Sequence, residues 1–519
     1  MTQYIKNQTG QYDGYLIFAV LVSCMRRSKV KFLADFNDIE KKYECPKWFQ
    51  DGKFGIWSHW GPQSVPMAGD WYARNMYREG TPQYYHHIRH FGHPSQNGYA
   101  EICENWKAEK FDPERLMELY VKCGAKYFVA QAMHHDNFFN YPSEVNPFNS
   151  MNVGPHKDIL GMWKNAAQKY NIPFGVSEHL AASYTFLSVS MDCDTYGKYA
   201  GIAYAGCGSN LMDFYKEDKE KGILDIAKIE AISPKQWYTT NKHFQEYWLH
   251  SMKELIDKYE PELIYSDGTI PFGIVGESDR NDVLFAKGLE MISYLYNQSL
   301  IRNGENLAVY TQKDMRSEIA RIGILDRERS QLSEISDRPW QTDTCLGGWF
   351  YDDRAIYKDA SHVIEILVDV VSKNGSLLLN ILQKPDGTLD EETEYVLEQI
   401  GSWLKYCGEG IYGTRPWKIY GEGNSKVIIN GLQEDKVNWT EKDIRYTCKD
   451  NHVFAFIMGK PESNRISLKS FKNEDKIQSV KLLGGMDCNF TQDSTELQVA
   501  LPNQLPTKLI NCLKITLKR

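Results

Sequence analysis

The chain alternates between short apolar runs that end in polar or glycine residues and longer stretches with helical apolar spacing. Short apolar runs between turn residues predict buried strands, and apolar residues at i, i+3 and i+4 predict amphipathic helices. The predicted strands are residues 53–61, 125–136, 172–180, 261–268, 307–312 and 375–382. The predicted helices are residues 112–124, 157–171, 242–260 and 359–375.

Strand and helix alternate in this way over about 350 residues, a pattern typical of a parallel α/β fold. A (β/α)₈-type barrel is the architecture it favours most. After about residue 410 the pattern of apolar and polar residues changes to short β-type runs separated by turn residues. This pattern predicts an all-β sandwich. We therefore expect a leader and linker in residues 1–45, a barrel in residues 46–407 and a C-terminal β-sandwich in residues 408–519.

Composition narrows the possible functions. The 519 residues carry a net charge of −8, so nucleic acid is not an expected partner. The 11 cysteines include no C-x-x-C pair, which argues against zinc-ribbon and thioredoxin-like sites and favours buried free thiols. Aromatic residues make up 13% of the chain, with 32 Tyr and 13 Trp. Such a supply serves either aromatic cores or surfaces that stack on sugar rings.

The N-terminal region contains an apolar run, residues 15–24, that ends in Leu-Val-Ser-Cys. The run is too short to span a bilayer but has the length of a signal-peptide core. Its ending resembles a bacterial lipoprotein processing site, which would leave Cys24 as a lipidated first residue. Lys6 is the only positive charge before the run, and a buried strand is the alternative. We expect an exported protein, periplasmic or anchored to a membrane at Cys24, with a cytoplasmic location as the alternative.

Four predicted strands in succession end in polar or titratable residues. The endings are His59-Trp60, His134-His135-Asp136, Glu178-His179 and Ser266-Asp267. The carboxyl ends of barrel strands meet on one face, where the active sites of such barrels are built. A single polar ending is usually a loop residue, but four in succession predict a shared site.

So many histidines raise the possibility of a metal site. His134 and His135 are adjacent on a predicted strand, so their side chains should leave opposite faces. That geometry is poor for binding one ion, and either histidine alone could be a buried structural residue. We expect neither a metal nor another cofactor.

Two-carboxylate chemistry is the alternative. Glycoside hydrolysis needs a carboxylate at the anomeric carbon and a second carboxyl group that protonates the leaving oxygen. Asp267 follows an apolar strand and precedes a glycine, which makes it the best nucleophile candidate. The segment 323–335, expected to be one loop, offers three possible partners, namely Asp326, Glu328 and Glu334.

Several sequence blocks resemble one enzyme family. They are WFQDGKFGIWSHWGPQSVP with DWYARNMY, MHHDNFFNYPS, NVGPHKDIL, PELIYSDG, WQTDTCLGGWFY, LVDVVSKNGSLLLNI and GEGIYGTRPW. In this order and spacing they are similar to glycoside hydrolase family 29, the α-L-fucosidases, over roughly residues 46–417. The resemblance implies a retaining exo-glycosidase with a catalytic barrel, a β-sandwich behind it and an oligosaccharide as substrate.

The resemblance also assigns roles to residues. Asp267 matches the nucleophile, and Glu328 best matches the acid/base, with Glu334 as the second choice. Sugar-hydroxyl contacts are implied for His59, His134 and His135, while Asp70 and Trp71 occupy the place of a Glu-Trp pair that holds the sugar. The other residues expected to contact substrate are Trp57, Glu178, His179 and Tyr265.

The chain departs from the family at several positions. Tyr265 and Ser266 precede the nucleophile, VYTQKD stands where many members carry an arginine, and SEHL replaces an ending that contains tyrosine. The polarity of Glu178 and His179 would suit a 6-hydroxyl group, so hydrolysis of α-L-galactosides is an alternative activity. A carbohydrate-binding protein without catalysis is an alternative of another class. The insertion at residues 181–235 is expected to shape the outer wall of the site.

Overall fold

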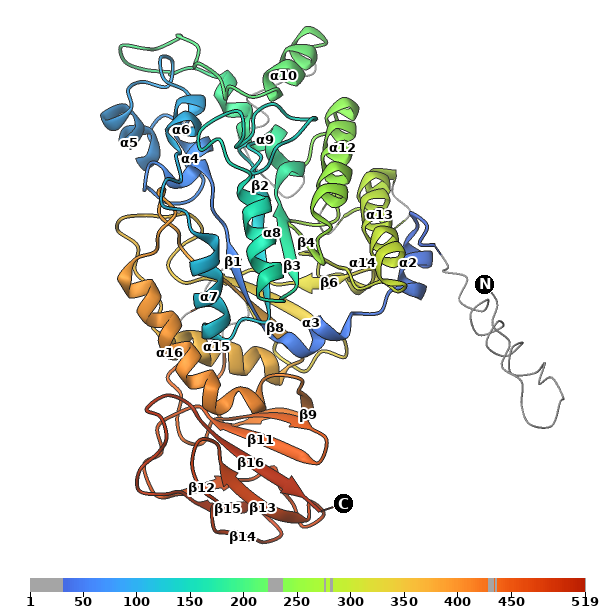
Figure 1. The fold of residues 1–519 in the computed structure, drawn as a ribbon, viewed down its shortest axis with the longest axis vertical. Helices are drawn as coiled ribbons and strands as arrows, with labels where there is room; N and C mark the ends of the chain where they lie inside the picture. Colours follow the sequence, from blue (N-terminus) through green and yellow to red (C-terminus); the bar gives the residue numbers. More distant parts are fainter. Residues whose placement is uncertain are drawn as a thin grey trace, which may run out of the picture.

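The computed structural model of the chain describes residues 31–222, 237–274, 277–280, 283–427, 434 and 436–518. Eight parallel strands close into a barrel in chain order. Figure 1 shows this barrel from the side. They are β1 (Phe54–Ser58), β2 (Tyr127–Met133), β3 (Phe174–Glu178), β4 (Leu263–Ser266), β5 (Val309–Gln312), β6 (Ile324–Asp326), β7 (Trp340–Cys345) and β8 (Gly375–Asn380). The predicted (β/α)₈-type fold is confirmed.

Helices cover the outside of the barrel. The main ones are α7 (Pro113–Cys123), α8 (Ile159–Lys169), α12 (Lys242–Tyr259), α13 (Ala286–Asn303), α15 (Ala360–Ser372) and α16 (Glu391–Cys407). The ends of α7 show how the sequence sets its boundaries. The Asp112 side chain caps the first turn by accepting from the Arg115 amide, and Gly124 ends the helix at φ 106°. Only the short α14 (Ser317–Ala320) lies between β5 and β6, and β6 runs to β7 without a helix.

Two barrel strands were missed by the apolar pattern. β6 has three residues, too few to form a recognisable run. β7 reads WQTDTC, and its polar side chains are buried in the barrel wall rather than exposed. The segment 323–335 is therefore not one loop, because Asp326 is the last residue of β6.

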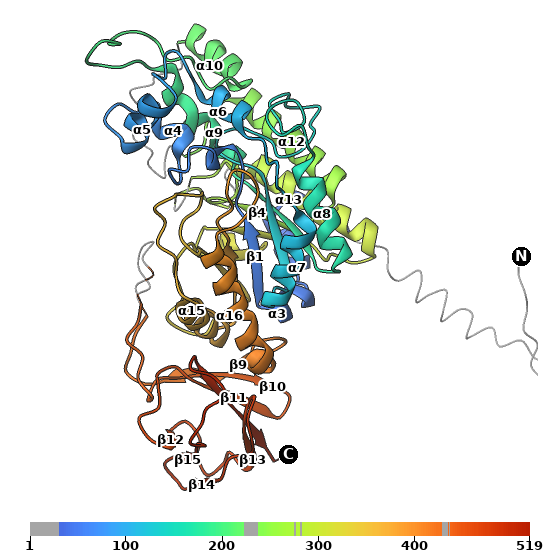
Figure 2. The ribbon, with the colours of Figure 1, turned by 60° about the vertical axis from the view of Figure 1, so that its left-hand side comes forward.

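The C-terminal region is an all-β sandwich, as predicted. A sheet in the order β13-β16-β11-β10-β9 packs against one in the order β12-β15-β14, and every pairing is antiparallel. The strands are β9 (Arg415–Glu422), β10 (Ile444–Lys449), β11 (His452–Ile457), β12 (Arg465–Leu468), β13 (Ile477–Leu482), β14 (Phe490–Gln492), β15 (Leu497–Ala500) and β16 (Asn511–Leu517). Figures 1 and 2 both place this sandwich below the barrel, next to α15 and α16.

The beginning of the described chain packs against the barrel. It forms α2 (Phe36–Lys42) and α3 (Lys47–Gly52), and Phe36 meets the ring of Phe285 edge-on at 5.3 Å. Residues 31–45, predicted as part of a leader and linker, thus contribute to the core. The apolar run 15–24 and Cys24 lie outside the described residues, so export and lipid anchoring stay predictions. Among the described residues, no helix has the length and hydropathy needed to cross a membrane.

Short elements gather at the end of the barrel far from the sandwich, as Figures 1 and 2 show. They are α4 (Tyr72–Asn75), α5 (Pro82–His90), α6 (Tyr99–Asn105), α9 (Ser183–Leu187) and α10 (Leu211–Glu220). Among the described residues, the 3₁₀ turns are η1 (Pro62–Ser64), η2 (Leu180–Ala182), η3 (Ser188–Met191), η5 (Val283–Phe285) and η6 (Gly408–Gly410), of which η6 follows α16 beside the sandwich strand β10. The buried Arg74 joins the first group to the 181–235 insertion, because its guanidinium donates to the Thr185 and Phe186 carbonyls.

The cysteines among the described residues are all unpaired thiols, and most of them are buried. This agrees with the prediction of free, buried thiols rather than a disulfide scaffold.

Candidate active site

A cavity of about 700 Å³ opens at the carboxyl ends of the barrel strands. It is lined by Trp57, His59, Asp70, Trp71, Asn75, His134, His135, His179, Trp237, Tyr265, Asp267, Gly268, Lys313, Glu328 and Trp349. All of the residues to which the sequence assigned a catalytic or substrate-binding role are in this set except Glu178 and Glu334, and the third candidate partner, Asp326, is not in it either. The predicted strand endings therefore do converge on one site.

Glu178 was expected to contact substrate, but it faces away from the cavity. Its carboxylate accepts a hydrogen bond from Ser266 Oγ at 2.6 Å and one from Trp248 Nε1 at 3.2 Å, between the barrel and α12. Alternation along a strand places His179 on the cavity side and Glu178 in the wall. The adjacent His134 and His135 do not alternate in this way, since both line the cavity. The prediction for Glu178 was wrong.

Asp267 lies in the cavity with both carboxylate oxygens engaged. Oδ1 is 2.6 Å from Lys313 Nζ, and Oδ2 is 3.2 Å from His135 Nε2. Burial alone would raise the pKa of this carboxyl group. The charge of Lys313 and the hydrogen bond from His135 outweigh burial and hold the pKa of Asp267 well below its ordinary value. The group is therefore an anion at neutral pH, as a nucleophile must be.

Lys313 joins the two candidate catalytic carboxylates. Its Nζ lies 2.6 Å from Asp267 Oδ1 and 2.5 Å from Glu328 Oε2. Those two oxygens can therefore be no more than 5.1 Å apart, the sum of the two contacts. Burial would lower the pKa of Lys313, but the surrounding carboxylates raise it well above its ordinary value, so the ammonium stays charged.

Glu328 follows β6 and reaches the cavity, whereas Glu334 does not. The backbone on both sides of Glu328 is tied to β7, because Arg327 N donates to Gln341 O and Arg329 N to Asp343 O. Glu334 is exposed, and its charge acts on Lys373, which precedes β8 at the other end of the barrel. The structure thus separates the two candidates that the sequence left open.

Asp326 and Asp343 form a buried carboxyl pair behind Lys313. Both are fully enclosed, Gln341 Nε2 donates to Asp326, and Tyr265 Oη donates to Asp343 at 2.9 Å. Burial and the charge of Asp343 raise the pKa of Asp326 well above its ordinary value. Burial raises the pKa of Asp343 to about 6, against the opposing charge of Lys313. Two like charges this close are not both stable, so Asp326 is the protonated partner.

His135 links Asp267 to the backbone of the neighbouring strand end. Nδ1 is 2.8 Å from the His179 carbonyl oxygen, and Nε2 is 3.2 Å from Asp267 Oδ2. With Asp267 ionised, both partners of the ring are hydrogen-bond acceptors. His135 thus bridges Asp267 and the His179 backbone.

His134 is neutral and has a defined tautomer. Gln63 accepts from the Ala73 amide through Oε1, so its Nε2 donates to His134 Nδ1 at 2.8 Å. Burial also lowers the pKa of His134 well below its ordinary value. The only ring hydrogen of His134 is therefore on Nε2, where it can be donated into the cavity.

Three buried histidines, His59, His134 and His179, present ring nitrogens within 4.8 Å of one another. A tetrahedral zinc ion would need about 3.4 Å between nitrogens, given bonds of about 2.1 Å. Nitrogens spread around a hydroxyl oxygen at hydrogen-bond distance lie about 4.6 Å apart. Since Gln63 also leaves His134 with an N–H instead of a lone pair, the cluster suits sugar hydroxyls better than an ion.

Aromatic rings form much of the cavity wall. The ring centroids of Trp57 and Trp349 are 5.5 Å apart. Those of Trp71 and Trp237 are 6.2 Å apart, and these two rings are nearly parallel. Asp70 stands beside this second pair and accepts from the Trp71 amide at 2.8 Å. Burial raises the pKa of Asp70 to about 7, so near neutral pH it can either donate or accept a hydrogen bond.

Sequence reasoning missed Asn75, Trp237, Gly268, Trp349 and, most importantly, Lys313. Lys313 stands directly after β5, in the segment VYTQKD where the family resemblance led us to expect an arginine. That position was a signal, because a cation one residue beyond a barrel strand should face the site.

Comparison with known proteins identifies the family. The model of the α-L-fucosidase family matches residues 19–409, and that of the α-L-fucosidase C-terminal domain matches residues 433–516. The chain belongs to the α-L-fucosidase family. It is thus a glycoside hydrolase, and the resemblance seen in the sequence blocks is confirmed.

Individual α-L-fucosidases agree with this assignment. Tissue α-L-fucosidase of Rattus norvegicus is 28% identical over 470 residues, which cover 89% of this chain and 86% of the relative. The structure of Thermotoga maritima α-fucosidase in complex with fucose aligns with a TM-score of 0.70 at 22% identity, covering 94% of this chain and all of that one. A Bacteroides thetaiotaomicron α-L-fucosidase aligns with a TM-score of 0.63 at 17% identity, over 92% of this chain and 97% of that one.

Proposed function

We propose that this protein hydrolyses terminal α-L-fucosides with retention of configuration, using Asp267 as nucleophile and Glu328 as acid/base. The separation of the two carboxylates carries this proposal. Retaining glycosidases hold their carboxyl groups about 5–5.5 Å apart, whereas inverting enzymes need about 6.5–9.5 Å to admit a water molecule. The oxygens of Asp267 and Glu328 lie at most 5.1 Å apart, which fits the retaining geometry.

The two carboxyl groups have different parts in the proposed reaction. Asp267 attacks the anomeric carbon while Glu328 gives its proton to the glycosidic oxygen, so the aglycone leaves and a glycosyl ester forms on Asp267. Glu328, now an anion, takes a proton from water, which attacks the anomeric carbon and releases Asp267. Lys313 contacts both groups. Its ammonium can therefore stabilise the negative charge on Asp267 before the ester forms and on Glu328 afterwards.

Sugar recognition uses neutral donors in an aromatic frame. His134 offers its Nε2 hydrogen, and burial lowers the pKa of His59 to about 3, so that ring is neutral as well. The rings of His59 and His179 line the cavity beside His134. We assign these three rings to the hydroxyl groups of the bound sugar.

Fucose is favoured over L-galactose as the substrate. The α-L-galactoside alternative rested on two polar residues, and one of them, Glu178, faces away from the cavity. The relatives described above carry the name α-L-fucosidase or α-fucosidase. No observation favours the galactoside.

A direct comparison of 4-nitrophenyl α-L-fucoside and α-L-galactoside tests the activity. The proposal predicts a higher kcat/KM for the fucoside, with the α-anomer of fucose as the first product seen by NMR. A preference for the galactoside would overturn the substrate assignment, and a β-anomer as first product would overturn the retaining mechanism. A folded protein that turns over neither substrate would support the carbohydrate-binding alternative.

A further inference from the structure

The residue after Glu328 is held in an unusual conformation. Arg329 has a φ of 43°, in the left-handed region that non-glycine residues seldom occupy. Its amide donates to Asp343 O at 2.8 Å. A conformation of this kind persists only where surrounding contacts impose it, so the side-chain contacts of Arg329 bear on how Glu328 is placed.

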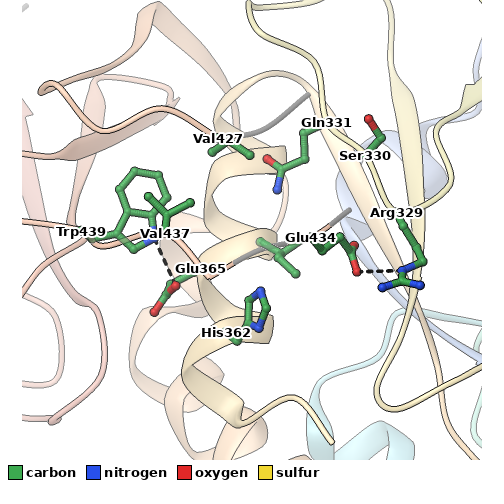
Figure 3. Close-up of a pocket in the computed structure, with 10 residues that line it drawn as sticks. Arg329, Ser330, Gln331, His362, Glu365, Val427, Glu434, Val437 and Trp439 are labelled. Atoms are coloured by element: carbon green, nitrogen blue, oxygen red, sulfur yellow. Dashed lines mark hydrogen bonds and ion pairs between the residues drawn. The ribbon is translucent and has the colours of Figure 1, made fainter. Parts of the chain in front are cut away.

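The side chain of Arg329 meets Glu434, which comes from the stretch between β9 and β10. Figure 3 shows the Glu434 carboxylate turned toward the Arg329 guanidinium, with 3.5 Å between Oε2 and Nε. The same oxygen accepts from Thr344 Oγ1 at 2.5 Å and lies 3.0 Å from Lys358 Nζ. The Glu434 side chain is only 5% exposed.

These contacts join two parts of the chain that are far apart in sequence. Thr344 belongs to β7 and Lys358 precedes α15, so both are parts of the barrel. Glu434 lies in the connection between the sandwich strands β9 and β10. Trp439, also between β9 and β10, contacts α15, because its Nε1 donates to Glu365 at 3.1 Å, a contact drawn in Figure 3. A carboxylate from the C-terminal region is therefore buried against the loop that carries Glu328.

We propose that Glu434 is a positioning residue for the acid/base. By pairing with Arg329, it holds the backbone that aims Glu328 at the glycosidic oxygen, so the C-terminal region takes part in forming the active site. This inference rests on the proposed role of Glu328. It does not extend to Asp267, which is held by Lys313 and His135 instead.

Dependence on the leaving group distinguishes this role from a general loss of structure. General acid catalysis matters for an aglycone that leaves poorly and little for one that is already a stable anion. In Glu434→Gln, we expect kcat/KM for phenyl α-L-fucoside to fall on the order of tenfold to a hundredfold, as for a small misplacement of a catalytic group. The kcat/KM for 2,4-dinitrophenyl α-L-fucoside should change less than threefold, roughly the effect of losing one weak ion pair.

A matched control is available on the same stretch. Lys436 pairs with Asp359 at the start of α15, 2.9 Å away, and both side chains are more than half exposed. Lys436→Met removes an ion pair of this stretch that does not touch the Glu328 loop, so both substrates should keep their wild-type values. Because Glu434→Gln leaves Lys358 and Arg329 without their anion, its fold is checked by thermal unfolding. If it does not fold, Arg329→Met breaks the same contact from the other side.

The outcomes separate this inference from the proposed function. Glu328→Gln must itself lose far more activity toward the phenyl than the dinitrophenyl substrate, and failure of that result would overturn the acid/base assignment. If Glu328→Gln shows the split and a folded Glu434→Gln shows none, or loses both activities equally, the positioning role is overturned. A selective loss in Glu434→Gln with unchanged Lys436→Met supports it.

Discussion

Lys313 Nζ lies 2.6 Å from Oδ1 of Asp267, and this contact governs the charge of the proposed nucleophile. Burial would favour the protonated acid, whereas the ammonium holds the pKa of Asp267 well below its ordinary value. The site therefore keeps a buried carboxylate ionised by means of a neighbouring cation rather than by access to water.

Replacement of Lys313 by methionine should impair both protonation and catalysis. Without the ammonium, burial dominates and the pKa of Asp267 rises, so the acid limb of the kcat/KM profile should move to higher pH. At the optimum we expect a loss of about a hundredfold, typical of removing one preorganised charge contact. Lys313→Arg is the control, because it keeps the charge and should keep the acid limb near the wild-type position. An acid limb that is the same in Lys313→Met and wild type would contradict this account of Asp267.

The two candidate acid/base residues make opposite predictions. Glu328→Gln should lower kcat/KM for aryl fucosides by roughly 10²- to 10⁴-fold, the usual contribution of a general acid. Glu334→Gln should resemble wild type, since Glu334 is exposed and outside the cavity. Steady-state kinetics on the pair decides the assignment. Loss of activity in Glu334→Gln with a functional Glu328→Gln would reverse it.

The buried histidines predict a loss of stability in acid. Burial lowers the pKa of His59 from 6.5 to about 3 on folding, so below pH 6.5 the unfolded chain binds a proton that the folded chain does not. The stabilising effect of the neutral ring is present above that pH and is lost as the pH falls. Relative to His59→Phe, which has no titrating group there, the wild type should lose about 2 kcal/mol of unfolding free energy between pH 6.5 and pH 5. Urea unfolding of both proteins at the two pH values measures the change, and a constant difference would refute it.

Chelators should leave the activity unchanged. The spacing of His59, His134 and His179 and the tautomer set by Gln63 suit hydroxyl groups rather than a zinc ion. Incubation with EDTA followed by an assay on an aryl fucoside tests this expectation. A loss that Zn²⁺ restores would instead place a functional metal ion at these histidines.

Most of the barrel strands could be predicted from the sequence, but only part of the active site could. Apolar runs revealed six strands because parallel strands are buried on both faces. β7 escaped because its buried side chains are polar, and Asp343 is one of them. At the end of β3, the pattern marked Glu178 and His179 alike, since alternation alone does not say which of two neighbours faces the cavity. The contact of Lys313 with both carboxylates depends on three loops that meet only in the folded chain.

Trapping the covalent intermediate tests most directly whether Asp267 is the nucleophile. A Bacteroides thetaiotaomicron α-L-fucosidase is described as a trapped covalent intermediate in complex with 2-fluoro-fucosyl fluoride, using a Glu-to-Gln mutant. We propose the same reagent for Glu328→Gln of this protein, followed by peptide mass spectrometry. We expect a single fluorofucosyl adduct on the peptide that contains Asp267, and no adduct in Glu328→Gln combined with Asp267→Asn. An adduct on another residue, or inactivation without any adduct, would contradict it.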